Sequence, residues 1–110
     1  VLNKGGQEGN YLEGSCSAMF TYVFAKGAKK GYLPADYLDI ARKSFLSMID
    51  NFIITGDDGL PVMTSICGAA GLGGNPYRDG SYAYYIGERK VNNDPKGVAP
   101  FIMAALELNM

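Results

Sequence analysis

Two stretches of this sequence predict helices that are apolar around almost their whole circumference. From Asn10 to Lys26 the apolar residues fill two neighbouring helical stripes, and from about Val98 or Ala99 to Glu107 nearly every face is apolar. Such a helix needs neighbours on all sides, because apolar surface is unfavourable in water. Both stretches are therefore expected to be inner helices.

A third helix, predicted from Pro34 to about Ile54, differs in kind because it is apolar on one side only. Its apolar stripe contains Tyr37, Ala41, Phe45, Met48 and Phe52, and charged residues occupy the opposite side. It is expected to be an outer helix that forms an αα-hairpin with the first. Three helices of these kinds cannot cover one another, so the chain is expected to be a piece of a larger helical assembly or to self-associate.

Both apolar helices have residues typical of a helix N-terminus. Asn10 is expected to cap the first, with Glu13 as the capping-box partner three residues later. Asp94 and Pro95 suit the cap and first position of the last helix. Pro100 would remove an intrahelical bond, so a short separate turn is expected before the regular helix.

Two strands and a turn are predicted between these helices. Gly56 to Gly59 is a turn, Leu60 to Cys67 alternates as a strand does, and the tyrosine-rich stretch from Ser81 to Ile86 suits a second strand. The glycine-rich stretch from Gly71 to Ser81 would then be the long tip of a hairpin.

The stretch from Gly71 to Ser81, called the glycine loop below, is the candidate functional segment. Four glycines surround Tyr77, Arg78 and Asp79. A guanidinium beside a carboxylate can hold a sugar carboxylate or hydroxyls, while glycine backbone offers N–H donors. Two alternatives stay open: a plain turn, and an Arg–Asp pair that fixes the shape of the loop. The glycine spacing matches neither a P-loop nor a dinucleotide fingerprint.

Composition excludes several classes of function. The chain has 110 residues, 47% of them hydrophobic, which allows one domain at most. The net charge of −1 without a basic cluster argues against nucleic acid, and no apolar run is long enough to cross a membrane. Histidine is absent, which removes His-activated nucleophiles and most zinc sites.

Three smaller features of the sequence concern an acidic pair, the two cysteines and the first residue. Asp57 and Asp58 lack the spacing of an EF-hand, so a solvated turn is expected there. Cys16 and Cys67 are expected to be buried core thiols, with a disulfide or a reactive thiol as the alternatives. Because residue 1 is Val rather than Met, the chain is expected to begin inside a longer protein.

Several motifs together resemble one enzyme family in order and spacing. They are Asn10-Tyr11-Leu12-Glu13-Gly14-Ser15, Lys30-Gly31-Tyr32-Leu33, the whole glycine loop, Tyr84-Tyr85, and Asn93-Asp94-Pro95-Lys96-Gly97-Val98. The family is that of the unsaturated rhamnogalacturonyl hydrolases, glycoside hydrolase family 105, related to the unsaturated glucuronyl hydrolases of family 88. The resemblance implies a mainly α chain with a small β-hairpin, the C-terminal part of an (α/α)6 barrel. Residues 1–110 would then be a truncated part of a single catalytic domain.

The resemblance also implies a reaction. The family removes an unsaturated uronic acid from pectin-derived oligosaccharides by hydrating its C4–C5 double bond, with an aspartic acid as proton donor and with neither metal nor cofactor. Its catalytic Asp and the His, Trp and Arg residues that hold the substrate would lie upstream of Val1, so no catalytic residue is assigned here and the chain alone is expected to be inactive. Substrate contact is expected from the glycine loop, through Gly73, Gly74, Asn75, Tyr77 and Arg78.

The expected partners are the unsaturated uronyl oligosaccharide and either the missing N-terminal part of the barrel or a second copy of the chain. The resemblance implies a bacterial protein of the cytoplasm or periplasm. Two alternatives of other classes remain: a helical interaction module that oligomerises, and a carbohydrate-binding module without catalysis.

Overall fold

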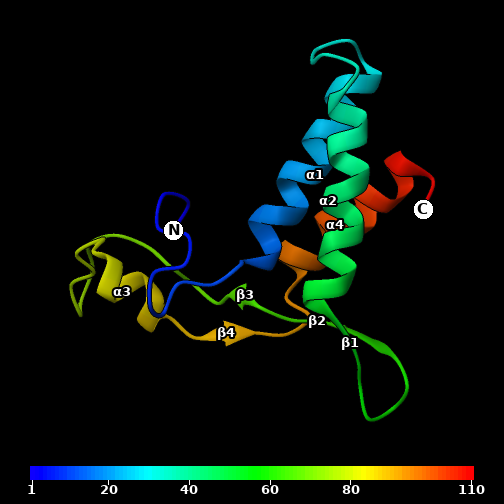
Figure 1. Ribbon diagram of the computed structural model, residues 1–110. Helices are drawn as coiled ribbons and strands as arrows, with labels where there is room; N and C mark the ends of the chain where they lie inside the picture. Colours follow the sequence, from blue (N-terminus) through cyan, green and yellow to red (C-terminus); the bar gives the residue numbers. More distant parts are fainter.

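The computed structural model describes residues 1–110 and is mainly helical, with two small antiparallel strand pairs, as predicted (Figure 1). The helices are α1 (Gly14–Lys29), α2 (Tyr37–Phe52), α3 (Tyr82–Gly87) and α4 (Pro95–Leu108). The strands are β1 (Ile53–Thr55), β2 (Pro61–Met63), β3 (Ile66–Cys67) and β4 (Lys90–Val91). Helix α1 packs against both α2 and α4, while α3 and the N-terminal segment lie together at the other side. None of the helices combines the length and apolar character that a bilayer crossing requires.

Helix α1 begins at Gly14, three residues later than a cap at Asn10 predicts. Its cap is Glu13 itself, whose carboxylate accepts from the Ser15 and Cys16 amides, so Glu13 caps the helix directly and Asn10 does not. The Asn10 amide nitrogen instead donates to the Val1 and Lys4 carbonyls and closes the N-terminal loop. A residue with two side-chain oxygens satisfies two of the free N–H groups at a helix start, which explains the later boundary.

Helices α2 and α4 are also bounded differently from the prediction. The outer helix spans Tyr37–Phe52, shorter than expected, and its buried face consists of Ala41, Phe45, Met48 and Phe52. Helix α4 is continuous from Pro95 and contains Pro100, so the prediction of a separate first turn was wrong. Pro100 lies early in the helix, where it removes only one intrahelical bond, and it is buried.

The strand predictions were partly wrong. The turn from Gly56 to Gly59 is confirmed, and it closes a hairpin in which Ile53 pairs with Met63. The stretch from Leu60 to Cys67 is split into β2 and β3, because Ser65 adopts a φ of 59° between them. Strand β3 pairs with β4, through Ile66 and Val91.

The tyrosine-rich stretch after the glycine loop is helix α3 rather than a strand. Ser81 caps it by accepting from the Tyr84 amide, and Tyr82 donates to the Glu8 carbonyl of the N-terminal segment. The glycine loop is therefore not a hairpin tip, because it joins β3 to α3.

The core lies where α1, α2 and α4 meet the strands. Its buried apolar residues are Ala18, Ala25, Ala41, Phe45, Met48, Phe52, Met63, Ile66, Ala104 and Leu108. Alanines let the helices approach closely, but large side chains of the same helices point outward. Met19, Phe20 and Val23 of α1 and Ile102, Met103 and Leu106 of α4 are exposed. The two apolar helices thus keep one uncovered face each.

Candidate functional site

The glycine loop has a defined shape, which two reciprocal backbone hydrogen bonds between Gly73 and Arg78 hold in place. The Gly73 amide donates to the Arg78 carbonyl at 2.8 Å, and the Arg78 amide donates back to the Gly73 carbonyl at 3.0 Å. Gly73 and Gly74 have φ of 69° and 85°, a region that disfavours residues with a Cβ. The Asn75–Pro76 peptide bond inside this turn is cis. The amides of Gly74 and Asn75 donate to no atom of the chain and stay available.

Arg78 holds the loop from within. Its Nε donates to the Gly73 carbonyl at 2.9 Å and its Nη2 to the Leu72 carbonyl at 3.2 Å. A Cβ on Gly71 would lie 2.4 Å from Nη1 of Arg78, so the guanidinium packs flat against that glycine. Arg78 is half-buried, and the two carbonyls take up only two of the five N–H donors of its guanidinium.

Asp79 does not pair with Arg78. Its carboxylate accepts from the Ser81 amide at 2.9 Å, and this hydrogen bond lowers the pKa of Asp79. Each residue of the pair therefore shapes the loop separately. Tyr77 is 78% exposed and Asn75 is exposed beside it, so both side chains are free to meet a ligand.

The base of the loop is fixed by three neighbouring elements. The Gly71 amide donates to the Tyr84 hydroxyl of α3 at 3.1 Å. The Gly68 amide donates to the Arg89 carbonyl at 2.8 Å, and Lys96 of α4 donates through Nζ to the Gly68 carbonyl at 2.6 Å. The loop is thus presented on a rigid frame.

Glu13 connects the start of α1 to strand β3. It is only 8% exposed, and its carboxylate accepts from the Ser15 amide and hydroxyl, from the Cys16 amide at 2.7 Å and from the Cys67 amide at 2.9 Å. Burial raises the pKa of Glu13, but these hydrogen bonds outweigh burial and the pKa lies below its usual value. Glu13 therefore stays ionised at neutral pH.

The two cysteines are free thiols, which excludes a disulfide within this structure. Cys67 is buried as predicted, whereas Cys16 is only half-buried. Burial and the neighbouring Glu13 raise the pKa of Cys16 to about 11, so its thiolate is disfavoured at neutral pH. No group of three or more His, Cys, Asp and Glu side chains is placed to hold a metal ion.

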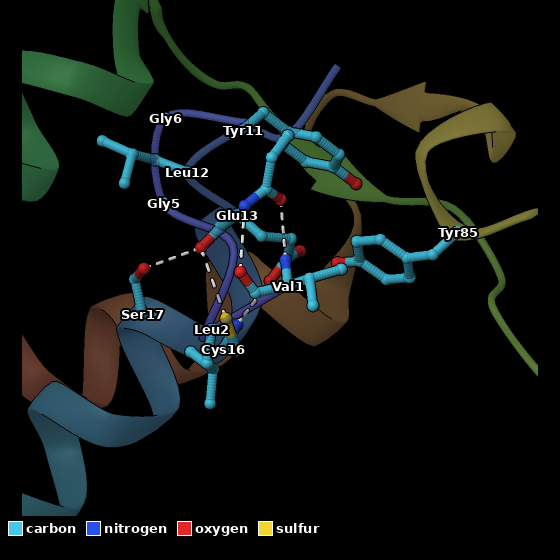
Figure 2. A pocket seen from close by; sticks show the side chains of 11 residues that line it. Val1, Leu2, Gly5, Gly6, Tyr11, Leu12, Glu13, Cys16, Ser17 and Tyr85 are labelled. Atoms are coloured by element: carbon cyan, nitrogen blue, oxygen red, sulfur yellow. Dashed lines mark hydrogen bonds between the residues drawn. The ribbon is translucent and has the colours of Figure 1, made fainter. Parts of the chain in front are cut away.

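A pocket of about 480 Å³ lies where the N-terminal segment folds over the start of α1 (Figure 2). We call it the tyrosine pocket; it is lined by Val1, Leu2, Gly5, Gly6, Asn10, Tyr11, Leu12, Glu13, Cys16, Ser17 and Tyr85. The rings of Tyr11 and Tyr85 are stacked, with centroids 6.1 Å apart and planes 9° from parallel. Burial raises the pKa of Tyr11 far above its usual range, with smaller contributions from Tyr85 and Cys67.

The whole chain matches a known protein family. The family model described as Glycosyl Hydrolase Family 88 matches residues 1–110. The chain belongs to Glycosyl Hydrolase Family 88. The predicted resemblance to families 88 and 105 is thereby confirmed.

A solved structure agrees with the Family 88 assignment. The chain superposes with a TM-score of 0.94 and 46% identity on a family 105 glycoside hydrolase of C. acetobutylicum ATCC 824, over 99% of this chain and 30% of that one. The mainly α fold prediction is confirmed by this match. A superposition this close means that these helices take the arrangement they have within a much longer glycoside hydrolase chain.

Curated relatives of this Family 88 chain are also longer. Protein Atu3128 of Agrobacterium fabrum and a 24.9 kDa protein in the picA locus of Rhizobium radiobacter are each 37% identical to it over 113 residues. The match covers 97% of this chain and 48% of each relative, so the chain spans about half the length of those proteins.

The structure places the five predicted contact residues of this Family 88 chain within one turn of the glycine loop. They are Gly73, Gly74, Asn75, Tyr77 and Arg78. Their contact with substrate stays a prediction. Sequence reasoning missed the tyrosine pocket, because Tyr11 and Tyr85 are far apart in the chain and neither lies in a spacing pattern that signals a site. For Glu13 the sequence favoured helix capping over acid–base catalysis and gave no sign of the bond to Cys67.

Proposed function

We propose that this chain is the C-terminal part of a glycoside hydrolase that releases an unsaturated uronic acid from rhamnogalacturonan-derived oligosaccharides. One observation carries the proposal, the match of nearly the whole chain to a family 105 glycoside hydrolase at a TM-score of 0.94. The motifs of the glycine loop and of the helix starts, which resemble those of unsaturated rhamnogalacturonyl hydrolases, supply the substrate class.

The proposed reaction is hydration of the C4–C5 double bond of the uronic acid. A general acid adds a proton at C4 and water adds a hydroxyl group at C5, after which the sugar ring opens and the bond to the neighbouring sugar breaks. This step needs an acid whose pKa lies near the working pH.

Three carboxylates of the chain do not suit that role. The pKa of Glu13 is lowered because hydrogen bonds outweigh burial, that of Asp79 by the Ser81 amide, and that of Asp94 by the Lys96 amide. A carboxylic acid that loses its proton more readily than usual is a poor proton donor at neutral pH. None of these three is therefore proposed as the catalytic acid, which the family resemblance implies lies upstream of Val1.

The part proposed for this chain is substrate contact by the glycine loop. Arg78 offers a positive charge for the uronate carboxylate, the free amides of Gly74 and Asn75 offer donors, and the exposed ring of Tyr77 offers a surface for the sugar. The proposed protein partner is the rest of the barrel, which would cover the exposed faces of α1 and α4.

Two measurements on the purified chain test this function. The chain is expected to bind an unsaturated rhamnogalacturonan disaccharide without converting it, with conversion followed as loss of absorbance from the double bond. Replacing Arg78 by Ala should weaken binding about tenfold or more, since a charge-assisted contact is lost. The control is Arg42→Ala, on the exposed side of α2, where only Asp39 is contacted.

Each contrary result has a defined meaning. Turnover by the 110-residue chain would contradict a catalytic acid outside it. Equal binding by the Arg78 and Arg42 variants would contradict substrate contact by the loop. A folded chain without any affinity for the disaccharide would favour the helical interaction module instead.

A further inference from the structure

The chain contains two Asp–Gly pairs, Asp58–Gly59 in the turn between β1 and β2 and Asp79–Gly80 in the glycine loop. The carboxyl group of an aspartate can be attacked by the nitrogen of the peptide bond that follows it. Glycine at the next position favours this attack, because it has no Cβ to shield the nitrogen. Neither pair takes part in the proposed substrate contacts, and the structure distinguishes one pair from the other.

The reaction rearranges the backbone and needs no second reactant except water. The peptide nitrogen forms a bond to the side-chain carboxyl carbon, while its proton and the hydroxyl of the carboxyl group leave together as water. The product is a cyclic succinimide. Hydrolysis returns the water and opens the ring at either carbonyl, which gives aspartate or isoaspartate. In isoaspartate the main chain runs through the side-chain carbon and is one methylene longer.

The two pairs hold their carboxyl groups in a similar way. In both, the aspartate is exposed and its carboxylate accepts from the amide two residues later, that of Leu60 at 3.0 Å and that of Ser81 at 2.9 Å. The glycine φ is 79° at Gly59 and 70° at Gly80. A difference in rate between the two pairs must therefore come from the attacking nitrogen.

The attacking nitrogens differ in their hydrogen bonds. The Gly59 amide donates to the Gly56 carbonyl at 2.9 Å, inside the hairpin that the pairing of β1 with β2 closes. The Gly80 amide donates to no atom of the chain. The nitrogen of Gly59 has to give up a hydrogen bond before it can attack, whereas that of Gly80 has none to lose.

One effect slows the reaction at Asp79 and decides the conditions under which it is measured. The hydrogen bond from the Ser81 amide lowers the pKa of Asp79. The attack needs the protonated carboxyl group, because a carboxylate is a poor electrophile. Mildly acidic conditions raise the protonated fraction, so the reaction is followed there.

We propose that Asp79 converts spontaneously to isoaspartate in the folded chain, whereas the hydrogen bond of the Gly59 amide protects Asp58. The reactive site lies between Arg78, whose backbone closes the turn of the glycine loop, and Ser81, the cap of α3. A longer main chain at this point breaks the bond to the Ser81 amide and displaces Arg78 relative to α3. The resulting loss of substrate contact rests on the proposed function, but the rearrangement itself does not.

The test is ageing of the purified 110-residue chain at physiological temperature and mildly acidic pH, in water enriched in heavy oxygen. Each passage through the succinimide leaves one heavy oxygen in the new carboxyl group. Protein isoaspartate methyltransferase labels isoaspartate selectively, and peptide mapping by mass spectrometry locates both marks. They are expected to accumulate at Asp79 about fivefold or more faster than at Asp58, as for one hydrogen bond that has to break.

Two controls separate the effect of the fold from that of the sequence. In urea the hydrogen bond of the Gly59 amide is lost, so the two pairs should react at rates within about twofold of each other. In the folded chain, Asp79→Glu should remove the signal at position 79, because the longer side chain would have to close a larger ring. The slow signal at Asp58 should stay as it is in the wild type.

Binding of the unsaturated rhamnogalacturonan disaccharide measures the consequence for the glycine loop. The wild-type chain should lose binding capacity during ageing in proportion to the isoaspartate formed at Asp79. The Asp79→Glu variant should keep after ageing the affinity that it has when fresh. The matched variant Asp58→Glu should lose capacity on ageing as the wild type does.

Three results would overturn the inference. They are a folded chain in which Asp58 reacts as fast as Asp79, a folded chain in which neither reacts, and a difference that persists unchanged in urea. An isoaspartate form that binds the disaccharide as well as the fresh chain would contradict the effect on the loop. The proposed function fails separately, if the fresh chain does not bind the disaccharide at all.

Discussion

Glu13 links the elements that position the glycine loop. Its carboxylate joins the first turn of α1 to strand β3, which leads directly into the glycine loop. In Glu13→Gln one oxygen becomes an NH₂ group that faces backbone N–H donors, so buried donors lose their acceptor. We expect a loss of about 2 to 3 kcal/mol in the free energy of unfolding.

Urea denaturation followed by circular dichroism measures this loss. The control variant is Glu8→Gln, because Glu8 is exposed and only its backbone carbonyl accepts a hydrogen bond, from Tyr82. It should change the free energy of unfolding by less than about 0.5 kcal/mol. Equal values for the two variants would show that Glu13 has no structural role.

The lowered pKa of Glu13 also predicts how stability depends on pH. Because the folded pKa lies below the reference value of 4.5, the unfolded state binds the proton more readily. The stabilisation is fully present above about pH 4.5 and is lost as the pH falls through the folded pKa. Glu13→Gln should therefore unfold with a shallower acid dependence than the wild type below that pH, measured by urea midpoints at several pH values.

At the scale of elements, α4 and β3 approach each other closely at Gly97. A Cβ on Gly97 would lie 2.6 Å from Cδ1 of Ile66, a fully buried side chain. Gly97→Ala is therefore expected to destabilise the fold by about 1 to 3 kcal/mol through overpacking, even though Ala favours helices.

The matched control for Gly97→Ala is Gly87→Ala at the end of α3. A Cβ there meets nothing within 4 Å, and the residue does not have a positive φ. Thermal unfolding should show a clear fall in Tm for Gly97→Ala and little change for Gly87→Ala. A stabilised Gly97→Ala variant would mean that α4 and β3 separate in solution.

Helix α3 is the element for which local patterns predicted the wrong type of secondary structure. Alternating tyrosines favour a strand, but here Tyr82 and Tyr84 bond to the N-terminal segment and to the glycine loop. A helix of six residues places these two hydroxyls on neighbouring partners, so tertiary contacts override a weak propensity. The N-terminal segment is distant from α3 in the sequence, whereas the glycine loop directly precedes it.

At the scale of the whole molecule, the chain exposes more surface than a compact protein of its size. Its accessible area is 7031 Å², whereas a compact monomer of this mass has about 5,900 Å². Its radius of gyration is 15.3 Å, against about 13 Å for a compact domain of this length. The excess of about 1,100 Å² exceeds one partner's share of a standard interface.

This excess predicts that the isolated chain associates through the exposed faces of α1 and α4. Sedimentation velocity should show oligomers, and Leu106→Lys, at a residue of α4 that is 72% exposed, should reduce them. The control is Ile54→Lys on strand β1, which is 53% exposed and belongs to the hairpin with β2 rather than to these helices. A strictly monomeric wild-type chain that binds no hydrophobic dye would contradict the uncovered faces.

Local patterns in the sequence were enough to predict the three long helices, the contrast between two apolar helices and one amphipathic helix, and the turn at Gly56 to Gly59. Periodicity and turn chemistry are local, so residues within a few positions suffice to specify them. Only the tertiary structure decided that Glu13 bonds to Cys67, that α3 is a helix and that Tyr11 meets Tyr85. Each of these involves at least one contact between residues more than fifty positions apart, which no local pattern can identify.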